Sequence, residues 1–178
     1  MAPSMVELLE DCSGWEIEDI PDQHLVFIRV HIDHFNEQSG EFIPLAFKNR
    51  DDDQGVTAMS SDWSKYGDPG KTQEAGAQEP QSEKYHVISL GVQEIREIIP
   101  LQFVVHAPVC DDPKLPNNQA HTNILGPKSR KEFVELSKSD DKRSGTNWAR
   151  LESDRVRLAF ANAIKTWEIR ATKPSQLA

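Results

Sequence analysis

The sequence contains two cysteines, Cys12 and Cys110, among its 178 residues. Two thiols so far apart in the chain give no disulfide framework and no Cys-x-x-Cys metal-binding knuckle. No apolar run approaches the roughly 20 residues needed to span a bilayer, and Met1–Trp15 lacks the basic start of a secretory signal. These absences favour a cytoplasmic protein and predict no membrane association.

Basic residues are fewer than acidic ones: the chain has 20 Lys and Arg and 29 Asp and Glu, which gives a formal net charge of −9. Such a surface repels phosphate backbones and anionic lipid headgroups, which disfavours nucleic acid and membranes as partners. Apolar residues make up 37% and charged residues 28% of the chain, a globular composition on the polar side. The length predicts a single domain over residues 1–178.

Alternating apolar and polar residues predict a set of strands. The clearest is Leu25–Asp33, where four β-branched residues occupy every second position. Leu101–Val109 is the most apolar run and is expected to be a central strand, with Phe103, Val105, Ala107 and Val109 on one face. Further strands are expected at Phe42–Phe47, Val56–Ser60, Tyr85–Gly91 and His121–Leu125.

Helices are expected at the two ends of the chain and at Val92–Ile99. Ser4 and Glu7 form a capping box for a short N-terminal helix. From Thr146 onward, large apolar residues recur every three to five positions as far as Trp167, which predicts a long C-terminal helix. Gly67–Glu83 has no large apolar side chain and is expected to be a mobile loop (67–83). The predicted class is α+β, a mostly antiparallel or mixed sheet covered by the long C-terminal helix.

Arg29, His31 and Asp33 alternate along the first strand and therefore share a face. A cation, an imidazole and a carboxylate on one face can bind a phosphate and move a proton. The same pattern also arises from ion pairs on a merely solvated face. His31 and His34 form a His-x-x-His pair, but positions three apart on a strand face opposite sides, so no metal site is predicted there.

His106 and His121 are the second candidate group. His106 is predicted to face away from Phe103 and Val105, and His121 shares a face with Asn123. Two histidines with a neighbouring amide can serve as acid, base and anion holder. The alternative is that each imidazole is a buried, hydrogen-bonded structural residue.

Ser60 and Ser61 follow a short apolar stretch without the Gly-x-Ser-x-Gly elbow of a serine nucleophile. They are interpreted as part of a capped turn that holds Trp63 over the core. Neither a Walker loop nor Gly-x-Gly-x-x-Gly occurs, and no cofactor and no metal are predicted.

Five short motifs occur in a recognisable order between residues 25 and 126. They are Arg29-Val30-His31, Ala46-Phe47-Lys48, Met59-Ser60-Ser61-Asp62, Val104-Val105-His106-Ala107-Pro108 and Asn118-Gln119-Ala120-His121. Together they resemble a group of small bacterial proteins that carry Arg-x-His, Ala-Phe, Ser-Val-Asp, Val-Val-His-x-Pro and Asn-Pro-Ala-His segments. Here Ser61 replaces the Val and Gln119 replaces the Pro. The resemblance implies that the histidines belong together and implies no particular reaction.

Two functions from different classes follow. The first is an accessory protein that binds a protein partner, indicated by the acidic surface and the absence of a complete catalytic motif. The second is an enzyme acting on a phosphate-containing or nucleotide-like substrate, a small anionic ligand. In that hypothesis Arg29 holds the anion, His31 and His121 transfer protons, and His106 orients or assists.

Overall fold

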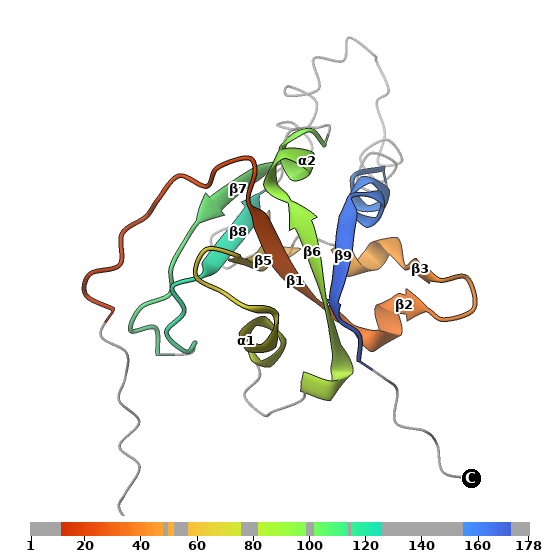
Figure 1. Cartoon of the computed structure of the whole chain (residues 1–178), viewed down its shortest axis with the longest axis horizontal. Coiled ribbons are helices and arrows are strands. Elements are labelled where there is room, and N and C mark those ends of the chain that lie inside the picture. Colours follow the sequence, from red (N-terminus) through yellow and green to blue (C-terminus); the bar gives the residue numbers. More distant parts are fainter. Residues whose placement is uncertain are drawn as a thin grey trace, which may run out of the picture.

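The computed structural model describes residues 12–47, 50–51, 57–75, 82–98, 102–113, 115–125 and 155–171. Within these residues the main sheet is antiparallel, with the strand order β7-β8-β5-β1-β6-β9, and β4 pairs with β5 off this path (Figure 1). The strands are β1 (Leu25–His31), β4 (Arg50–Asp51), β5 (Thr57–Trp63), β6 (Tyr85–Gly91), β7 (Phe103–His106), β8 (His121–Leu125) and β9 (Ile164–Ile169). β2 (Phe35–Asn36) and β3 (Glu41–Phe42) form a separate two-stranded sheet.

The described helices are few and short. They are α1 (Pro69–Glu74), α2 (Val92–Arg96), a helix over residues 155–162, and the 3-10 turns Ile32–His34, Pro44–Phe47 and Ser82–Lys84. No described helix is long and apolar enough to cross a membrane. The α+β class is therefore confirmed in its coarse form, as an antiparallel sheet with a few helices.

The strand register divides the sheet into two faces, because residues directly opposite one another in an antiparallel pair share a face. Val26 pairs with Leu90 and Trp63, Ile28 pairs with Ile88, and Val104 pairs with Ile124. These residues are buried and form the core face. The core is completed by α2, the 155–162 helix and the Pro44–Phe47 turn through Val92, Ile95, Val156, Phe160 and Phe47.

The opposite face is more polar. Phe27 pairs with Asp62 and Ser89, Arg29 with Val87, His31 with Tyr85, and Asp62 with His121. Helix α1 packs near β1 and β6 (Figure 1), and its Thr72 is buried there. We call this the α1 face.

The prediction of a long C-terminal helix is wrong. The helix ends at residue 162, and the residues that follow form β9, which pairs with β6 at the edge of the sheet. Ile164, Thr166, Trp167 and Ile169 are β-branched or aromatic and suit a strand, and pairing with β6 decides the conformation over the helical spacing. Residues 146–154, where the helix was expected to begin, lie outside the described residues, as does the expected N-terminal helix.

The segment expected to be a mobile loop, 67–83, contains a regular element, because α1 covers Pro69–Glu74. Asp68 caps α1 by accepting a hydrogen bond from the Lys71 backbone N–H at 3.0 Å, and Pro69 occupies the first helical turn. Proline is preorganised for that position and an Asp cap is favourable, so the segment forms a helix without a large apolar side chain. Residues 76–81 lie outside the described residues.

The expectation that Leu101–Val109 is a central strand is also wrong, although the predicted alternation of its faces is confirmed. β7 lies at the edge of the sheet, not at its centre, and Phe103 and Val105 are 50% and 37% exposed. Val104 and His106 are buried instead, because they pair with Ile124 and Thr122 on the core face. The strands expected at Tyr85–Gly91 and His121–Leu125 are confirmed. Of Phe42–Phe47, only Phe42 is in a strand, because the chain turns into a 3-10 helix at Pro44.

Candidate functional site

β1 and β5 pair at only two positions, Val26 with Trp63 and Phe27 with Asp62. Beyond Phe27, β1 continues along β6 as far as His31, whereas β5 continues along β8. The two strands therefore diverge inside the sheet. β4 pairs with β5 at Ala58 and Thr57, beyond the part of β5 that pairs with β1. A pocket of about 690 Å³ lies at this divergence, and we call it the split-sheet pocket.

The pocket brings together residues from several separate parts of the chain. β1 contributes Arg29 and His31, and β5 contributes Ser60 and Asp62. Further polar contributors include Tyr85, Thr72, His34, Asn118, His121 and Asn123. Of the four residues predicted to form a site, the pocket thus collects Arg29, His31 and His121. Their convergence follows from the register, because β1, β5 and β8 all direct these positions to the α1 face.

Arg29 and His31 lie together against Tyr85. The Arg29 guanidinium carbon is 4.5 Å from the centre of the Tyr85 ring, a cation–π contact. The His31 ring meets the same tyrosine edge-on, with ring centres 5.2 Å apart. His31 Nδ1 also accepts a hydrogen bond from the Asp33 backbone N–H at 3.2 Å. One wall of the pocket therefore carries a fixed cation beside an imidazole.

His121 lies across the pocket and is held at both ring nitrogens. Its Nδ1 lies 2.7 Å from the Ala107 carbonyl oxygen, and its Nε2 lies 3.0 Å from Ser60 Oγ. Because a carbonyl oxygen can only accept, Nδ1 carries the proton in the neutral ring and Nε2 is left as the acceptor for the serine hydroxyl. The hydrogen bonds thus orient His121 and select its tautomer.

Asp62 and Asn118 form the floor between these two walls. Asp62 is 6% exposed, and its carboxylate accepts a hydrogen bond from Asn118 Nδ2 at 2.8 Å. Asn118 Oδ1 in turn accepts from the Ala120 backbone N–H at 3.0 Å, which holds the turn before β8. Thr72 of α1 is 3% exposed, and its Oγ1 has no hydrogen-bond partner among the described residues. A buried hydroxyl of this kind is suited to a polar ligand in the pocket.

His106 lies on the core face, away from the other three residues. It is 3% exposed and stacks on Tyr66, with ring centres 5.8 Å apart. Its Nδ1 accepts from the Glu18 backbone N–H at 3.1 Å, and its Nε2 donates to the Gln119 carbonyl at 2.7 Å. Both nitrogens are therefore engaged in tying the segment before β1 to the turn before β8. These contacts favour the alternative that His106 is a buried, hydrogen-bonded structural residue.

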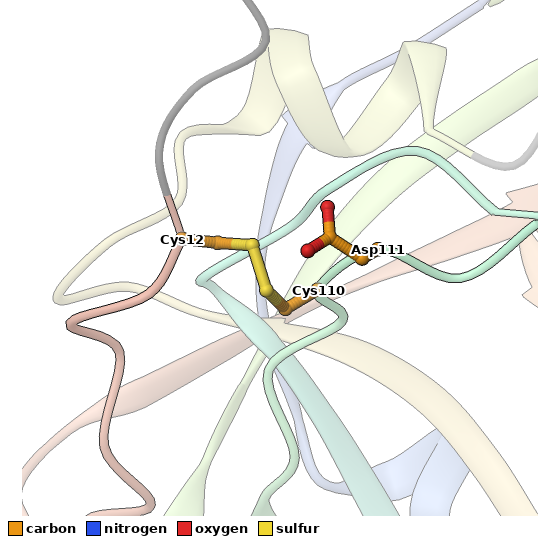
Figure 2. Close-up of side chains that lie close together, drawn as sticks. All are labelled: Cys12, Cys110 and Asp111. Atoms are coloured by element: carbon orange, nitrogen blue, oxygen red, sulfur yellow. A yellow bond between two sulfur atoms is a disulfide. The ribbon is translucent and has the colours of Figure 1, made fainter.

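His31 and His34 lie beside each other, with ring centres 6.2 Å apart. Among the described residues, however, the one group of three or more metal-ligand side chains is elsewhere, at Cys12, Cys110 and Asp111. Figure 2 shows that the two cysteines of this group form a disulfide. Their sulfur atoms are bonded to each other and are unavailable as thiolate ligands while that bond is intact. This pairing corrects the expectation that the two cysteines form no disulfide.

The disulfide fastens the segment before β1 to the loop after β7. The two Cα atoms are 5.8 Å apart and the cysteines are separated by 98 residues in sequence. Asp111, next to Cys110, has a positive φ of 53°, and its backbone N–H donates to Asn117 Oδ1 at 2.8 Å. This loop also supplies Val109 and Asn118 to the pocket, so the disulfide anchors part of the pocket rim.

Ser60 was expected at the end of a short strand, in a capped turn before Trp63, and the structure places it in the middle of β5 beside His121. One sequence pattern could have indicated this site. Ser60 and Asp62 are two residues apart, as are His121 and Asn123, so each pair forms a short polar face on a strand. The pairing of those two strands could not be predicted from the sequence. Tyr85 and Thr72 carried no recognisable signal.

No family model matches this chain, and neither do any curated protein sequences or solved structures. The short-motif resemblance to small bacterial proteins therefore stays a prediction. In the structure, residues from four of its five motifs line the split-sheet pocket: Arg29 with His31, Ala46, Ser60 with Asp62, and Asn118 with His121.

Proposed function

We propose that the protein is an enzyme that binds a small phosphate-containing or nucleotide-like substrate in the split-sheet pocket. The observation that carries this proposal is the convergence of Arg29, His31 and His121 on one pocket from β1 and β8. The pocket volume of about 690 Å³ is within the range of small-molecule sites. Although the chain has a net charge of −9, the pocket is lined by one arginine and three histidines. The Asp62 carboxylate in the pocket already accepts a hydrogen bond from Asn118.

The roles follow from the contacts. Arg29 binds the anionic group, because a guanidinium pairs with phosphate through several N–H donors. His121 accepts a proton at Nε2, since its Nδ1 proton is held by the Ala107 carbonyl. His31 serves as the second proton carrier from the opposite wall. His106 has no part in this scheme, because both of its ring nitrogens are engaged on the core face.

Inorganic phosphate titrated into the protein and followed by NMR tests the anion site. We expect the imidazole signals of His31 and His121 to shift in the wild type and to shift much less in Arg29→Gln. Arg170→Gln is the matched control, because Arg170 is an exposed arginine that also lies over aromatic rings, 5.2 Å from Trp167, and pairs with Glu37. Phosphate shifts that survive Arg29→Gln unchanged would remove the anion site from this proposal.

Turnover is then measured on a panel of phosphate mono- and diesters. His31→Ala and His121→Ala are each expected to abolish hydrolysis while lowering the melting temperature by no more than a few degrees, because both side chains are only half-buried. If either substitution unfolds the chain, that histidine is a structural residue and its proposed role in proton transfer is wrong.

A second candidate, an accessory protein that binds a protein partner, is supported by β7. Among the described residues no strand pairs with the outer edge of β7, and its Phe103 and Val105 side chains are exposed. An exposed edge with alternating apolar side chains is suited to an extended segment of a partner, which adds a strand to the sheet. Gel filtration and pull-down from the native lysate, comparing the wild type with Val105→Lys, test this candidate. Equal capture by both proteins would exclude the β7 edge as the docking site.

A cytoplasmic location is part of the same proposal, and it requires the Cys12–Cys110 disulfide to be reduced for much of the protein's life. Thiol alkylation in a rapidly quenched cell extract, followed by mass spectrometry, reads the redox state directly. Two alkylated cysteines are expected for a cytoplasmic protein, and an intact disulfide indicates an oxidising compartment.

A further inference from the structure

Ser60, His121 and the Ala107 carbonyl form a chain of hydrogen bonds at the rim of the split-sheet pocket. We infer that Ser60 is a covalent nucleophile, with His121 as its general base and the Ala107 carbonyl in the orienting role that a carboxylate fills in serine hydrolases. This inference deepens the proposed function and rests on it for the phosphate ester as substrate.

The direction of each proton supports the assignment. The Ala107 carbonyl accepts the His121 Nδ1 proton at 2.7 Å, so the neutral ring presents an unprotonated Nε2 to Ser60 Oγ at 3.0 Å. That is the tautomer that removes a proton from a serine hydroxyl. The Ala107 backbone N–H also donates to the His121 carbonyl at 3.0 Å. The orienting carbonyl is therefore fixed to β8, the strand that carries the base.

The strand geometry leaves Ser60 accessible to a substrate. β5 pairs with β1 at Asp62 and Trp63 and with β4 at Thr57 and Ala58, so the segment Met59–Ser61 has no strand partner on that side. Ser60 is exposed, and its hydroxyl lies in the pocket. A serine on a regular strand reaches a substrate here because the neighbouring strand has moved away, and no sharp elbow is required.

The same divergence supplies donors for developing negative charge. Leu25 exchanges hydrogen bonds with Ser64 through its backbone N–H and C=O, which fixes the odd-numbered residues of β1 as those whose backbone groups face β5. The backbone N–H of Arg29 consequently points into the opening, as does that of Ser60 from the other strand. An anion bound between the two strands would face both of these amides.

The reaction balances without a further reagent. Ser60 Oγ attacks the phosphorus and its proton passes to His121 Nε2, while His31 on the opposite wall gives a proton to the leaving alcohol as the bond from phosphorus to that alcohol breaks. Water then attacks the phosphoserine and gives a proton to His31, and His121 returns its proton to Ser60 Oγ as the bond from phosphorus to Oγ breaks. The sum is a phosphate ester plus water giving an alcohol plus phosphate.

A fluorophosphonate probe tests the nucleophile without knowledge of the substrate, because it releases fluoride when an activated serine attacks its phosphorus. We expect the wild type to acquire one phosphonyl group on Ser60, identified by peptide mass spectrometry. Ser60→Ala and His121→Gln are expected to lower labelling by at least tenfold. Ser61→Ala is the matched control, because the Ser61 hydroxyl lies on the core face, 2.7 Å from Thr122 Oγ1.

The outcomes separate this inference from the anion site. Labelling of Ser60 that depends on His121 supports the nucleophile even where Arg29→Gln leaves phosphate binding unchanged and the anion site fails. Absence of labelling in the folded wild type overturns the nucleophile, even where phosphate binds through Arg29. Labelling of Ser60 that persists in His121→Gln also overturns it, because the serine then reacts without the proposed base.

Discussion

The side chains of Ser61 and Thr122 are hydrogen bonded to each other, 2.7 Å apart, inside the core face of the sheet. On the α1 face, Ser60 and His121 are diagonal neighbours across the same two strands, and their side chains are hydrogen bonded 3.0 Å apart. The register between β5 and β8 thus produces two polar pairs, one buried and one open to the pocket. The two pairs are expected to differ in what they contribute to stability.

Ser61→Ala is expected to destabilise the protein by about 1–3 kcal/mol, because it leaves the buried Thr122 hydroxyl without a partner. Ser60→Ala is expected to change the free energy of unfolding by no more than about 0.5 kcal/mol, as for other exposed positions. Urea unfolding of the two variants beside the wild type measures both values. Equal losses would mean that the Ser60–His121 pair is as structural as the Ser61–Thr122 pair.

His106→Ala is expected to lower the free energy of unfolding by about 2–4 kcal/mol, since it opens a cavity beside Trp63 and Tyr66 and removes two hydrogen bonds. Phosphate binding followed through His31 and His121 is expected to persist in this variant at temperatures below its transition. If the variant is as stable as the wild type but loses phosphate binding, His106 is part of the binding site and not a structural residue.

Loss of the disulfide is expected to destabilise the chain by about 2–4 kcal/mol, because the bond closes a long loop in the unfolded state. The Cys12→Ser, Cys110→Ser double variant should match the wild type measured in a strong phosphine reductant, and thiol alkylation verifies the redox state of each sample. Unchanged stability in the double variant would show that the segment before β1 is held by its other contacts alone.

Glu18 provides a pH-dependent contribution. The hydrogen bonds from Lys65 and Tyr66 lower the pKa of Glu18 below 4.5, and the hydrogen bond to Glu18 raises the pKa of Lys65 above 10.5. A lowered carboxyl pKa stabilises the fold above the pKa of the unfolded state, and this stabilisation is lost as the pH falls through the folded value. A raised lysine pKa stabilises the fold below the unfolded value and is lost as the pH rises through the folded one.

The pair is therefore expected to stabilise the protein between about pH 4.5 and 10.5 and to lose its effect outside that window. Unfolding of the wild type and Glu18→Gln, measured from pH 2.5 to 7 in low salt, checks the acid side. The two curves should converge towards the acid end, and the difference at neutral pH should shrink in high salt, because the groups are exposed. A difference that is independent of pH would assign the effect of Glu18 to packing.

Strand alternation carried most of what the sequence predicted correctly. Leu25–Asp33 and Tyr85–Gly91 were recognisable because β-branched or apolar residues fill the core-facing positions. The 155–169 region misled, because its apolar spacing fits a helix and pairing with β6 makes its second half a strand. Leu101–Val109 was expected at the centre of the sheet because it is so apolar, but β7 is an edge strand and exposes Phe103 and Val105.

The candidate site was predictable only in part. Arg29 and His31 share a face by spacing alone, and so do His121 and Asn123. That these two faces coincide depends on β5, which lies between β1 and β8 and pairs with both. No local pattern encodes such long-range pairings, so Ser60 was assigned to a turn and the Cys12–Cys110 bond went unpredicted.

The divergence of β1 and β5 has a dynamic consequence. Val26 and Phe27 are the only residues of β1 that pair with β5, so we expect the two strands to spread apart beyond these positions in small opening motions. A ligand that bridges Arg29 and Ser60 would hold the two strands together and slow hydrogen exchange at the amides that face the opening. We therefore expect the size of molecule that the pocket admits to depend on backbone spreading as well as on the side chains of its walls.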